Sequence, residues 1–225
     1  MKTSAYLEKM RREWNVRARE NAAHYIANGV EQWDQREFYE SGKLTVEQDI
    51  LTDMWHVCQS REPKDMRVLE VGCGAGRVSW ALGTVFGEVH SVDVSEEMIH
   101  RARANSPCGP NVFFHRNNGM DLSVLPEAPF HFAYSTCVFH HIASREVIES
   151  YVREVHRSLL PGCLFKFEVQ GCLRVNSPAD DTWLGLPFSE TDAHEMAARC
   201  GFECRFAVGA GEERFWLWFF KPASS

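Results

Sequence analysis

The chain has 225 residues, of which 44% are apolar, and its 31 acidic and 24 basic side chains give a formal charge of −7. A chain of this length can bury a large core as one domain, or as one domain with a small appendage. The acidic balance argues against nucleic acid as the main partner, because binding to phosphate backbones requires clustered Lys and Arg.

Apolar runs, the N-terminal segment and the cysteines indicate the cellular compartment of the protein. Its longest aromatic apolar run, residues 215–220, is far shorter than the roughly 20 residues that a membrane helix needs. The charged segment at the N-terminus is unlike a signal peptide, and none of the eight cysteines belongs to a Cys-x-x-Cys pair. The sequence therefore predicts a cytoplasmic protein with reduced thiols and no membrane partner.

Two helices are predicted before the first strand. Apolar residues recur at helical spacing over residues 4–28, and Gly29 supplies a stop signal. A second helix is predicted over residues 45–59, where Thr45 and Gln48 have the spacing of a capping box.

From residue 67 onward, strands and helices alternate. Strands are predicted at 68–71, 89–92, 111–115, 130–136 and 164–169, and helices at 77–86, 96–104, 145–160 and 191–200. Residues 202–208 and 213–221 are expected to form a hairpin at the end of the chain. Nearly continuous apolar strands that alternate with helices predict a doubly wound α/β fold, in which helices cover both faces of a parallel sheet.

The pattern divides the chain near residue 60. Residues 1–60 are expected to form an N-terminal helical extension, or lid, packed on the core, and residues 61–225 a Rossmann-like domain. In such folds, ligands bind at the carboxyl ends of the strands. Candidate site residues are therefore expected there.

A glycine-rich turn, Glu70-Val71-Gly72-Cys73-Gly74-Ala75-Gly76, ends the first strand and opens a helix. Glycines permit a tight turn and close approach of a ligand to the backbone, and the helix N-terminus offers free N–H groups. The dinucleotide fingerprint would require a small residue where Arg77 stands, and Glu70 is an awkward neighbour for a pyrophosphate. A ligand with an ammonium group and no phosphate fits this turn better.

Three further segments follow the next strands. Asp93 ends the second strand, where an acid can accept hydrogen bonds from a ribose diol. Asn118-Gly119-Met120 follows the third strand, where the amide could read an adenine edge. Residues 135–141 follow the fourth strand, where a reacting group would meet a cofactor.

Residues 66–169 resemble the core of the class I S-adenosylmethionine-dependent methyltransferases of small-molecule type. The resemblance rests on Glu-x-Gly-x-Gly-x-Gly at 70–76, Val-Asp-x-Ser-x-x-Met at 92–98, Asn-Gly-Met-Asp-Leu at 118–122 and Leu-Pro-Gly at 160–162. It implies a seven-stranded, mostly parallel sheet of order 3-2-1-4-5-7-6, with strand 7 antiparallel. It also implies S-adenosylmethionine as the cofactor, S-adenosylhomocysteine as its product, and no metal.

The resemblance also assigns roles to residues. Glu70 and the turn 72–76 would hold the methionine portion, Asp93 the ribose, and Met98 with residues 118–120 the adenine. Asn118 stands where many members carry Asp, and it can also be a plain turn former. The expected cofactor-binding residues are Glu70, Gly72, Cys73, Gly74, Gly76, Asp93, Val94, Met98, Asn118, Gly119, Met120, Thr136 and Cys137.

His140 and His141 are candidate catalytic residues. Methyl transfer from a sulfonium is an in-line displacement that needs a base only if the nucleophile arrives protonated, and His suits that task. The alternative is that they cap the next helix or pack under the lid. Trp14, Tyr25 and Trp183 are candidate substrate or lid residues, because aromatic faces suit a sulfonium or a flat substrate, with core packing as the alternative.

These features predict S-adenosylmethionine-dependent methyl transfer to an oxygen or nitrogen of a small-molecule acceptor. Methylation of a protein or RNA group, and a non-catalytic module that binds S-adenosylmethionine or S-adenosylhomocysteine, remain alternatives. No ligand cluster predicts zinc, and the acids are too dispersed to predict a magnesium site. The oligomeric state is left open.

Overall fold

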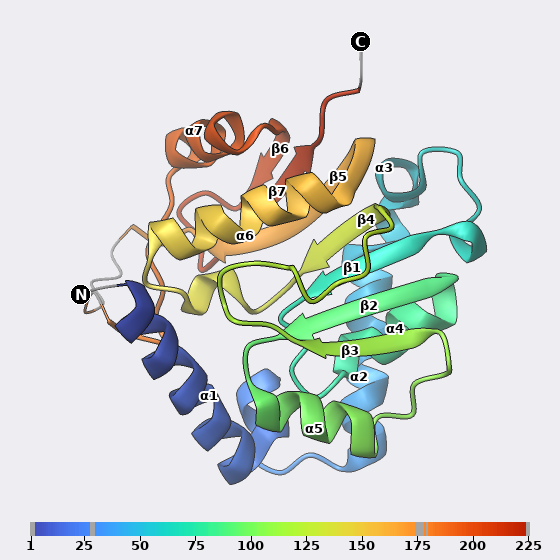
Figure 1. Ribbon diagram of the computed structural model, residues 1–225, viewed down its shortest axis with the longest axis vertical. Coiled ribbons are helices and arrows are strands. Elements are labelled where there is room, and N and C mark those ends of the chain that lie inside the picture. Colours follow the sequence, from blue (N-terminus) through green and yellow to red (C-terminus); the bar gives the residue numbers. More distant parts are fainter. Residues whose placement is uncertain (1–2, 28–29, 174–177, 179, 224–225) are drawn as a thin grey trace.

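A seven-stranded sheet lies at the centre of the computed structural model, which describes residues 3–27, 30–173, 178 and 180–223 (Figure 1). The strand order is β3-β2-β1-β4-β5-β7-β6, and β7 is antiparallel to both neighbours while the other pairs are parallel. This confirms the predicted sheet. The strands are β1 (Arg67–Val71), β2 (Glu88–Asp93), β3 (Val112–Arg116), β4 (Phe130–Ser135), β5 (Leu159–Gln170), β6 (Glu203–Val208) and β7 (Arg214–Phe220).

Helices cover both faces of the sheet. In the view of Figure 1, α6 crosses in front of the sheet, while α2 and α4 lie behind it. The helices are α1 (Thr3–Ile26), α2 (Gln35–Asp49), α3 (Met54–Cys58), α4 (Arg77–Val85), α5 (Glu96–Asn105), α6 (Arg145–Ser158) and α7 (Glu190–Cys200). Short 3-10 turns are η1 (Leu51–Asp53), η2 (Pro63–Asp65) and η3 (Phe139–His141).

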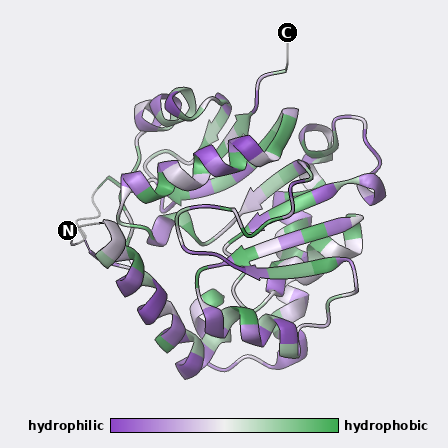
Figure 2. Cartoon of the chain, viewed as in Figure 1, coloured by the Kyte–Doolittle hydropathy of each residue, from purple (hydrophilic) through white to green (hydrophobic). Residues whose placement is uncertain are grey.

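Alternate side chains of the central strands supply two separate cores. Val68 and Leu164 face α2, α3 and α4, whereas their chain neighbours Leu69 and Phe165 face α6 and α7. All four are completely buried. In Figure 2, hydrophobic segments of the strands alternate with hydrophilic ones, while α1 and α5 are largely hydrophilic.

Helix α1 runs across the carboxyl ends of the strands and reaches α5 (Figure 1). Near its start, Tyr6 and Met10 join the core beneath α6, and near its end Ala18 and Ala22 pack on α5. Its backbone leaves the helical region at Asn21, with φ −164° and ψ 82°, so the last turn is set off by a kink. The predicted stop residue Gly29 lies outside the described residues.

The second helix differs from its prediction. The helix expected over residues 45–59 is in fact the end of α2, which begins at Gln35, followed by η1 and α3. The carboxylate of Asp34 caps α2 by accepting two backbone N–H groups at 2.9 and 3.2 Å. Thr45 lies inside the helix and donates its hydroxyl to the carbonyl of Ser41. The predicted capping box at Thr45 is wrong because Asp34 already meets the N-terminal hydrogen-bonding requirement.

Gly42, in the interior of α2, marks close packing between two helices. A Cβ atom at this position would lie 2.1 Å from the carbonyl oxygen of Arg77 at the start of α4. Glycine therefore lets the backbones of α2 and α4 meet directly, at the cost of helix propensity.

This packing predicts the effect of Gly42→Ala. Alanine normally favours a helix interior, but here its methyl group must push α2 away from α4, so we expect the free energy of unfolding to fall by roughly 1–3 kcal/mol. Urea denaturation measures this. Glu47→Ala, at an exposed site of the same helix, is the control and should stay within about 0.5 kcal/mol of wild type. Equal or greater stability of Gly42→Ala would contradict the direct helix contact.

Candidate functional site

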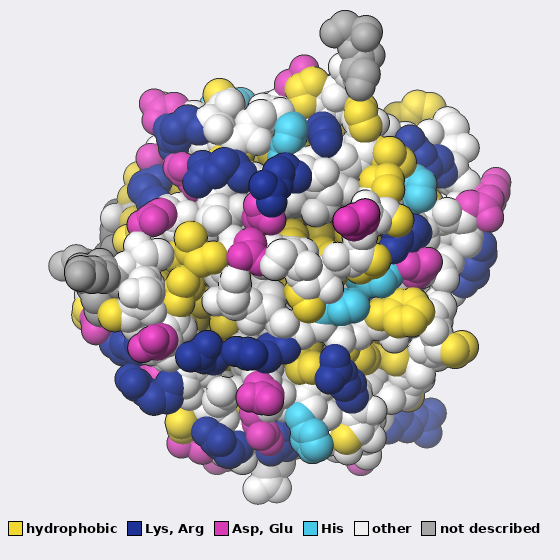
Figure 3. All heavy atoms as spheres, viewed as in Figure 1, with side chains coloured by type: hydrophobic (Ala, Val, Ile, Leu, Met, Phe, Trp, Pro, Cys, Tyr) yellow, Lys and Arg dark blue, Asp and Glu magenta, His cyan; other side chains and the backbone are white. Residues whose placement is uncertain are grey.

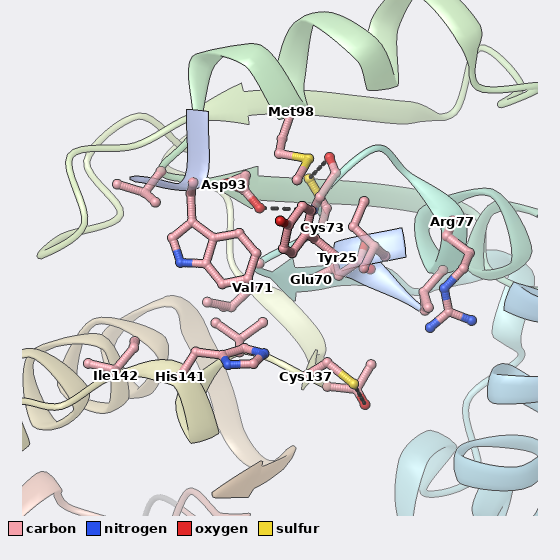
Figure 4. Close-up of a pocket in the computed structure, with 18 of the residues that line it drawn as sticks. Tyr25, Glu70, Val71, Cys73, Arg77, Asp93, Met98, Cys137, His141 and Ile142 are labelled. Carbon is pink, nitrogen blue, oxygen red and sulfur yellow. Dashed lines mark hydrogen bonds between the residues drawn. The ribbon is translucent and has the colours of Figure 1, made fainter. Parts of the chain in front are cut away.

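A pocket lies at the carboxyl ends of β1, β2 and β4, beneath α1 (Figure 4). It contains about 820 Å³ of space between atoms, including open solvent at its mouth. Most of the residues predicted from the sequence meet here. The lining residues are Met10, Trp14, Tyr25, Ile26, Glu70, Val71, Gly72, Cys73, Gly74, Arg77, Val78, Asp93, Val94, Met98, Thr136, Cys137, Val138, His141, Ile142 and Tyr151.

A carboxylate holds the glycine turn in place. Oδ2 of Asp93 accepts the N–H of Gly74 at 2.8 Å, a bond drawn in Figure 4, and Oδ1 accepts the N–H of Ser95 at 2.8 Å. Gly72 and Gly74 have φ values of 79° and 53°, which glycine adopts without steric cost. Burial raises the pKa of Asp93, and the backbone hydrogen bonds oppose that rise. The carboxylate therefore sits at the pocket with a fixed orientation.

Side chains pack directly on this turn. A Cβ on Gly74 would lie 2.8 Å from Cδ1 of Ile26, and one on Gly72 would lie 2.1 Å from Cγ2 of Val138. Ile26 belongs to the last turn of α1, beyond the kink at Asn21. A ligand that touches the backbone of Gly74 must therefore displace Ile26.

Glu70 is a buried carboxyl group on β1 that also lines the pocket. Its Oε2 accepts the hydroxyl groups of Ser79 at 2.5 Å and Ser91 at 2.8 Å. Burial raises the pKa of Glu70 to about 7, although both hydroxyls oppose the shift. The carboxyl group is therefore partly protonated near neutral pH, and a cation bound beside it would favour the ionised form.

Four of the expected cofactor-binding residues do not line the pocket. Asn118 is exposed, and its Oδ1 accepts the N–H groups of Met120 at 2.8 Å and Asp121 at 3.0 Å, as in a turn former. Gly119 lies under α1, and Met120 packs against the core. Gly76 begins α4 with a φ of 85° and faces β3.

Asn117, which the sequence reasoning did not select, is the buried member of this asparagine pair. Its Nδ2 donates to the hydroxyl of Tyr151 at 2.8 Å, and Tyr151 lines the pocket. Its Oδ1 is buried and makes no hydrogen bond within the described part of the chain. Asn117 thus lies behind the pocket, next to Tyr151, whereas Asn118 is at the surface.

The three predicted aromatic residues gather around His141, and we call Trp14, Tyr25, His141 and Trp183 the aromatic cluster. Ring centroids lie 4.8 Å apart for His141 and Trp183, 5.8 Å for Tyr25 and Trp183, and 5.2 Å for Trp14 and His141. Trp183 contacts these rings from outside the pocket lining. The guanidinium of Arg17, which was not predicted, lies over Trp14 at 4.9 Å and over Trp183 at 5.4 Å.

The two histidines form η3 and do not cap α6, whose N-cap is Ser144. Their Nε2 atoms are 3.0 Å apart, and Nδ1 of His141 lies 2.5 Å from the carbonyl oxygen of Trp183. Burial, with Arg214, lowers the pKa of His140 to about 4, and burial, with His140, lowers that of His141 to about 3. Both rings are neutral at pH 7. Only His141 lines the pocket, where Figure 4 shows it facing Tyr25 and Asp93.

Cys137 follows β4 with a φ of 57°, in the left-handed region that few non-glycine residues adopt. Its N–H donates to Oε1 of Glu168 at 2.6 Å, which holds this backbone in place. Burial raises the pKa of its thiol, so Cys137 is not an activated nucleophile.

Within residues 3–27, 30–173, 178 and 180–223, no group of three or more His, Cys, Asp or Glu side chains is arranged to hold a metal ion. No helix in the same ranges combines the length and apolar content that a bilayer crossing needs.

Residues 68–162 match a family model described as a methyltransferase domain. DhpI in its complex with SAH matches 97% of this chain and 98% of its own, at 16% identity and a TM-score of 0.66. Magnesium protoporphyrin IX methyltransferase (ChlM) from Synechocystis PCC 6803, with bound SAM, matches 95% and 96%, at 16% identity and a TM-score of 0.65. DesVI from Streptomyces venezuelae matches 87% of this chain and 100% of its own, at 16% identity and a TM-score of 0.64. At 16% identity, these similarities show a shared fold and no more. A search of curated proteins finds no match for the sequence.

The raised pKa of the buried Glu70 carboxyl group predicts how the stability of the fold changes with pH. Its folded-state pKa of about 7 lies above the ordinary 4.5, so ionisation is disfavoured in the fold, and this group's contribution to the free energy of unfolding is lost as pH rises from 4.5 to about 7. We expect Glu70→Gln to remove this loss, so that its stability relative to wild type improves by about 3 kcal/mol between pH 4.5 and pH 8.

Denaturation at a series of pH values measures this difference. Glu127→Gln, at an exposed site, is the control and should follow the wild-type pH dependence. Parallel curves for Glu70→Gln and wild type would contradict the raised pKa.

Proposed function

We propose that the chain is an S-adenosylmethionine-dependent methyltransferase of the class I fold and that it methylates an oxygen or nitrogen atom of a small molecule. The observation that carries the proposal is the position of Asp93. Its carboxylate is bonded to the glycine turn in a pocket that also contains neutral His141 and two aromatic side chains, Trp14 and Tyr25.

The lining residues suit the cofactor that this class uses. Each oxygen of Asp93 accepts one backbone N–H, which leaves lone pairs for the two hydroxyls of a ribose. Glu70 offers a carboxyl group that ionises beside an ammonium, and Met98 supplies an apolar wall. When bound, S-adenosylmethionine supplies an electrophilic methyl group on a positively charged sulfur.

The acceptor would bind on the opposite side of the pocket, against the aromatic cluster. Trp14, Tyr25 and His141 present ring faces there, and aromatic walls favour flat or apolar acceptors. α1 covers this side, and exclusion of water by a bound cofactor and acceptor would strengthen electrostatic interactions inside. His141 would lie beside the acceptor, with its Nδ1 against the carbonyl of Trp183 and its Nε2 against Nε2 of His140.

Surface charge supports a small acceptor over RNA. In the view of Figure 3, Lys and Arg side chains are interspersed with Asp and Glu, and the chain carries a formal charge of −7. RNA binding would call for a continuous basic surface. The eight cysteines are all free thiols, which supports placing the enzyme in a reducing compartment such as the cytoplasm.

Calorimetry tests the cofactor site. We expect wild type to bind S-adenosylmethionine and S-adenosylhomocysteine, and Asp93→Ala to weaken both by at least about tenfold, because it removes the ribose acceptor and releases Gly74. Asp65→Ala, an exposed aspartate outside the pocket, is the control and should bind like wild type. Absence of binding by wild type, or full affinity of Asp93→Ala, would contradict the site.

The acceptor class needs a separate measurement. Wild type should release S-adenosylhomocysteine when mixed with members of a library of small phenols, alcohols and amines. Release only with RNA or protein would instead support methylation of a macromolecule.

A further inference from the structure

Both ring nitrogens of His141 already have polar partners. Its Nδ1 lies 2.5 Å from the carbonyl oxygen of Trp183, and its Nε2 lies 3.0 Å from Nε2 of His140. Because a carbonyl only accepts hydrogen bonds, His141 carries its proton on Nδ1, and its Nε2 accepts a hydrogen bond from Nε2–H of His140. The imidazole that lines the pocket therefore has no lone pair left for the proton of an acceptor.

The phenols and thiols of the pocket lining hold their own protons. The hydroxyl of Tyr25 donates to the carboxylate of Glu20 at 3.0 Å, and this hydrogen bond raises its pKa. Burial raises the pKa of the thiols of Cys73 and Cys137 and that of the phenol of Tyr151. All of these groups are protonated at pH 7, so none of them can serve as a base.

The two carboxyl groups among the described lining residues, Glu70 and Asp93, lie near the ends of β1 and β2, on the side that suits the cofactor. On the side of the aromatic cluster, the described lining residues therefore provide no group that could take a proton. An alcohol must lose its proton in order to attack a methyl group, whereas an uncharged amine attacks through a lone pair that it already has.

Charge around the aromatic cluster favours a cation over an anion. Arg17 and Lys9 of α1 each lie 3.9 Å from the carboxylate of Glu13 on the same helix. Lys9 also lies 2.7 Å from Asp180, and Asp181 follows in the same loop. Three carboxylates thus stand beside two cations at this edge of the pocket.

An anionic acceptor would need a cation in the pocket, and Arg77 is the cation among the described lining residues. Its Nη1 donates to the carbonyl of Ser41 at 3.1 Å and to the hydroxyl of Thr45 at 2.9 Å, so the guanidinium is bonded to α2. Figure 4 draws it on the far side of the pocket from His141. A carboxylate or phosphate beside the aromatic rings would therefore be buried without a partner, which is costly.

We propose that the acceptor is an amine that attacks as the uncharged base, and that the rings of Trp14 and Tyr25 hold the ammonium group of its product. Both rings line the pocket, and aromatic faces attract alkylammonium groups. The proposal rests on the proposed function and selects nitrogen over oxygen within it.

The transfer step balances without a protein base. The lone pair of the amine nitrogen forms a bond to the methyl carbon, and the carbon–sulfur bond breaks with its electron pair remaining on sulfur. The protons of the amine stay on nitrogen during this step. One positive charge disappears at sulfur and one appears at nitrogen, so the pocket holds a single ligand cation before and after transfer. The product ammonium loses its proton to water after release.

Ligand binding tests the aromatic rings without turnover. Phenyltrimethylammonium and tert-butylbenzene have the same shape and differ in charge. With S-adenosylhomocysteine bound, we expect wild type to bind the cation at least about tenfold more tightly. Tyr25→Leu and Trp14→Leu should each lower this preference about fivefold, whereas Tyr25→Phe keeps a ring and should retain it. Trp55→Leu, at a site that is 80% exposed, is the control. Equal or weaker binding of the cation, or an unchanged preference in both leucine variants, would overturn the proposal.

Turnover with two amines of different basicity tests the absence of a protein base. Because the uncharged amine is the reactive form, we expect the ascending limb of the pH profile of kcat/KM to move to lower pH with the less basic amine. A protein base would hold that limb at one pH for both. Tyr25→Leu should raise KM for the amine about fivefold and leave KM for S-adenosylmethionine within about twofold of wild type.

Two outcomes of the turnover experiment would overturn the proposal: an ascending limb at the same pH for both amines, and release of S-adenosylhomocysteine with phenols, alcohols or acids but with no amine. Lack of cofactor binding, or of turnover with every acceptor, would instead reject the proposed function. The comparison of phenyltrimethylammonium with tert-butylbenzene requires no turnover, so the two failures are distinguishable.

Discussion

One hydrogen bond organises the pocket: the N–H of Gly74 donates to the carboxylate of Asp93. It joins the turn that follows β1 to the end of β2, the two strands whose carboxyl ends form the floor of the site. The bond requires a left-handed backbone at Gly74, which glycine adopts freely. The same carboxylate accepts the N–H of Ser95, the N-cap of α5. Loss of this acid would therefore disturb the turn, the helix start and the ligand position together.

Burial sets the chemistry of the titratable groups around this bond. It raises the pKa of Glu70 to about 7 and lowers those of His140 and His141 to about 4 and 3. Each shift favours the neutral form, so the pocket at pH 7 holds few charges of its own. A cationic ligand would then meet carboxyl groups that gain charge in its presence. Glu168 and Arg214 are the exception, since they neutralise one another directly behind the histidines.

The sheet order, the glycine turn and the end of β2 could be predicted because each depends on local sequence. Three features could not. The start of α2 was missed because Thr45 and Gln48 have the spacing of a capping box, whereas Asp34 caps the helix eleven residues earlier. Asn117 and Asn118 are adjacent and chemically identical, and only the path of the chain after β3 decides which is buried. Glu168 stands in a strongly apolar strand, and its partner Arg214 comes from β7, so their pairing depends on an antiparallel register between distant segments. Its contact with the backbone of Cys137 therefore could not be predicted without the fold.

The kink at Asn21 limits how much structure a ligand must rearrange to enter. The first part of α1 is held by Tyr6, whose hydroxyl donates to the carbonyl of Asp181 and accepts the N–H of Ala143, and by the ion pair of Lys9 with Asp180. The segment that covers the glycine turn comes after the kink and is one helical turn long. Opening the site at the kink would break the contacts of this segment, including those of Tyr25 with Trp183 and of Ile26 with Gly74, and would leave those of Tyr6 and Lys9 in place.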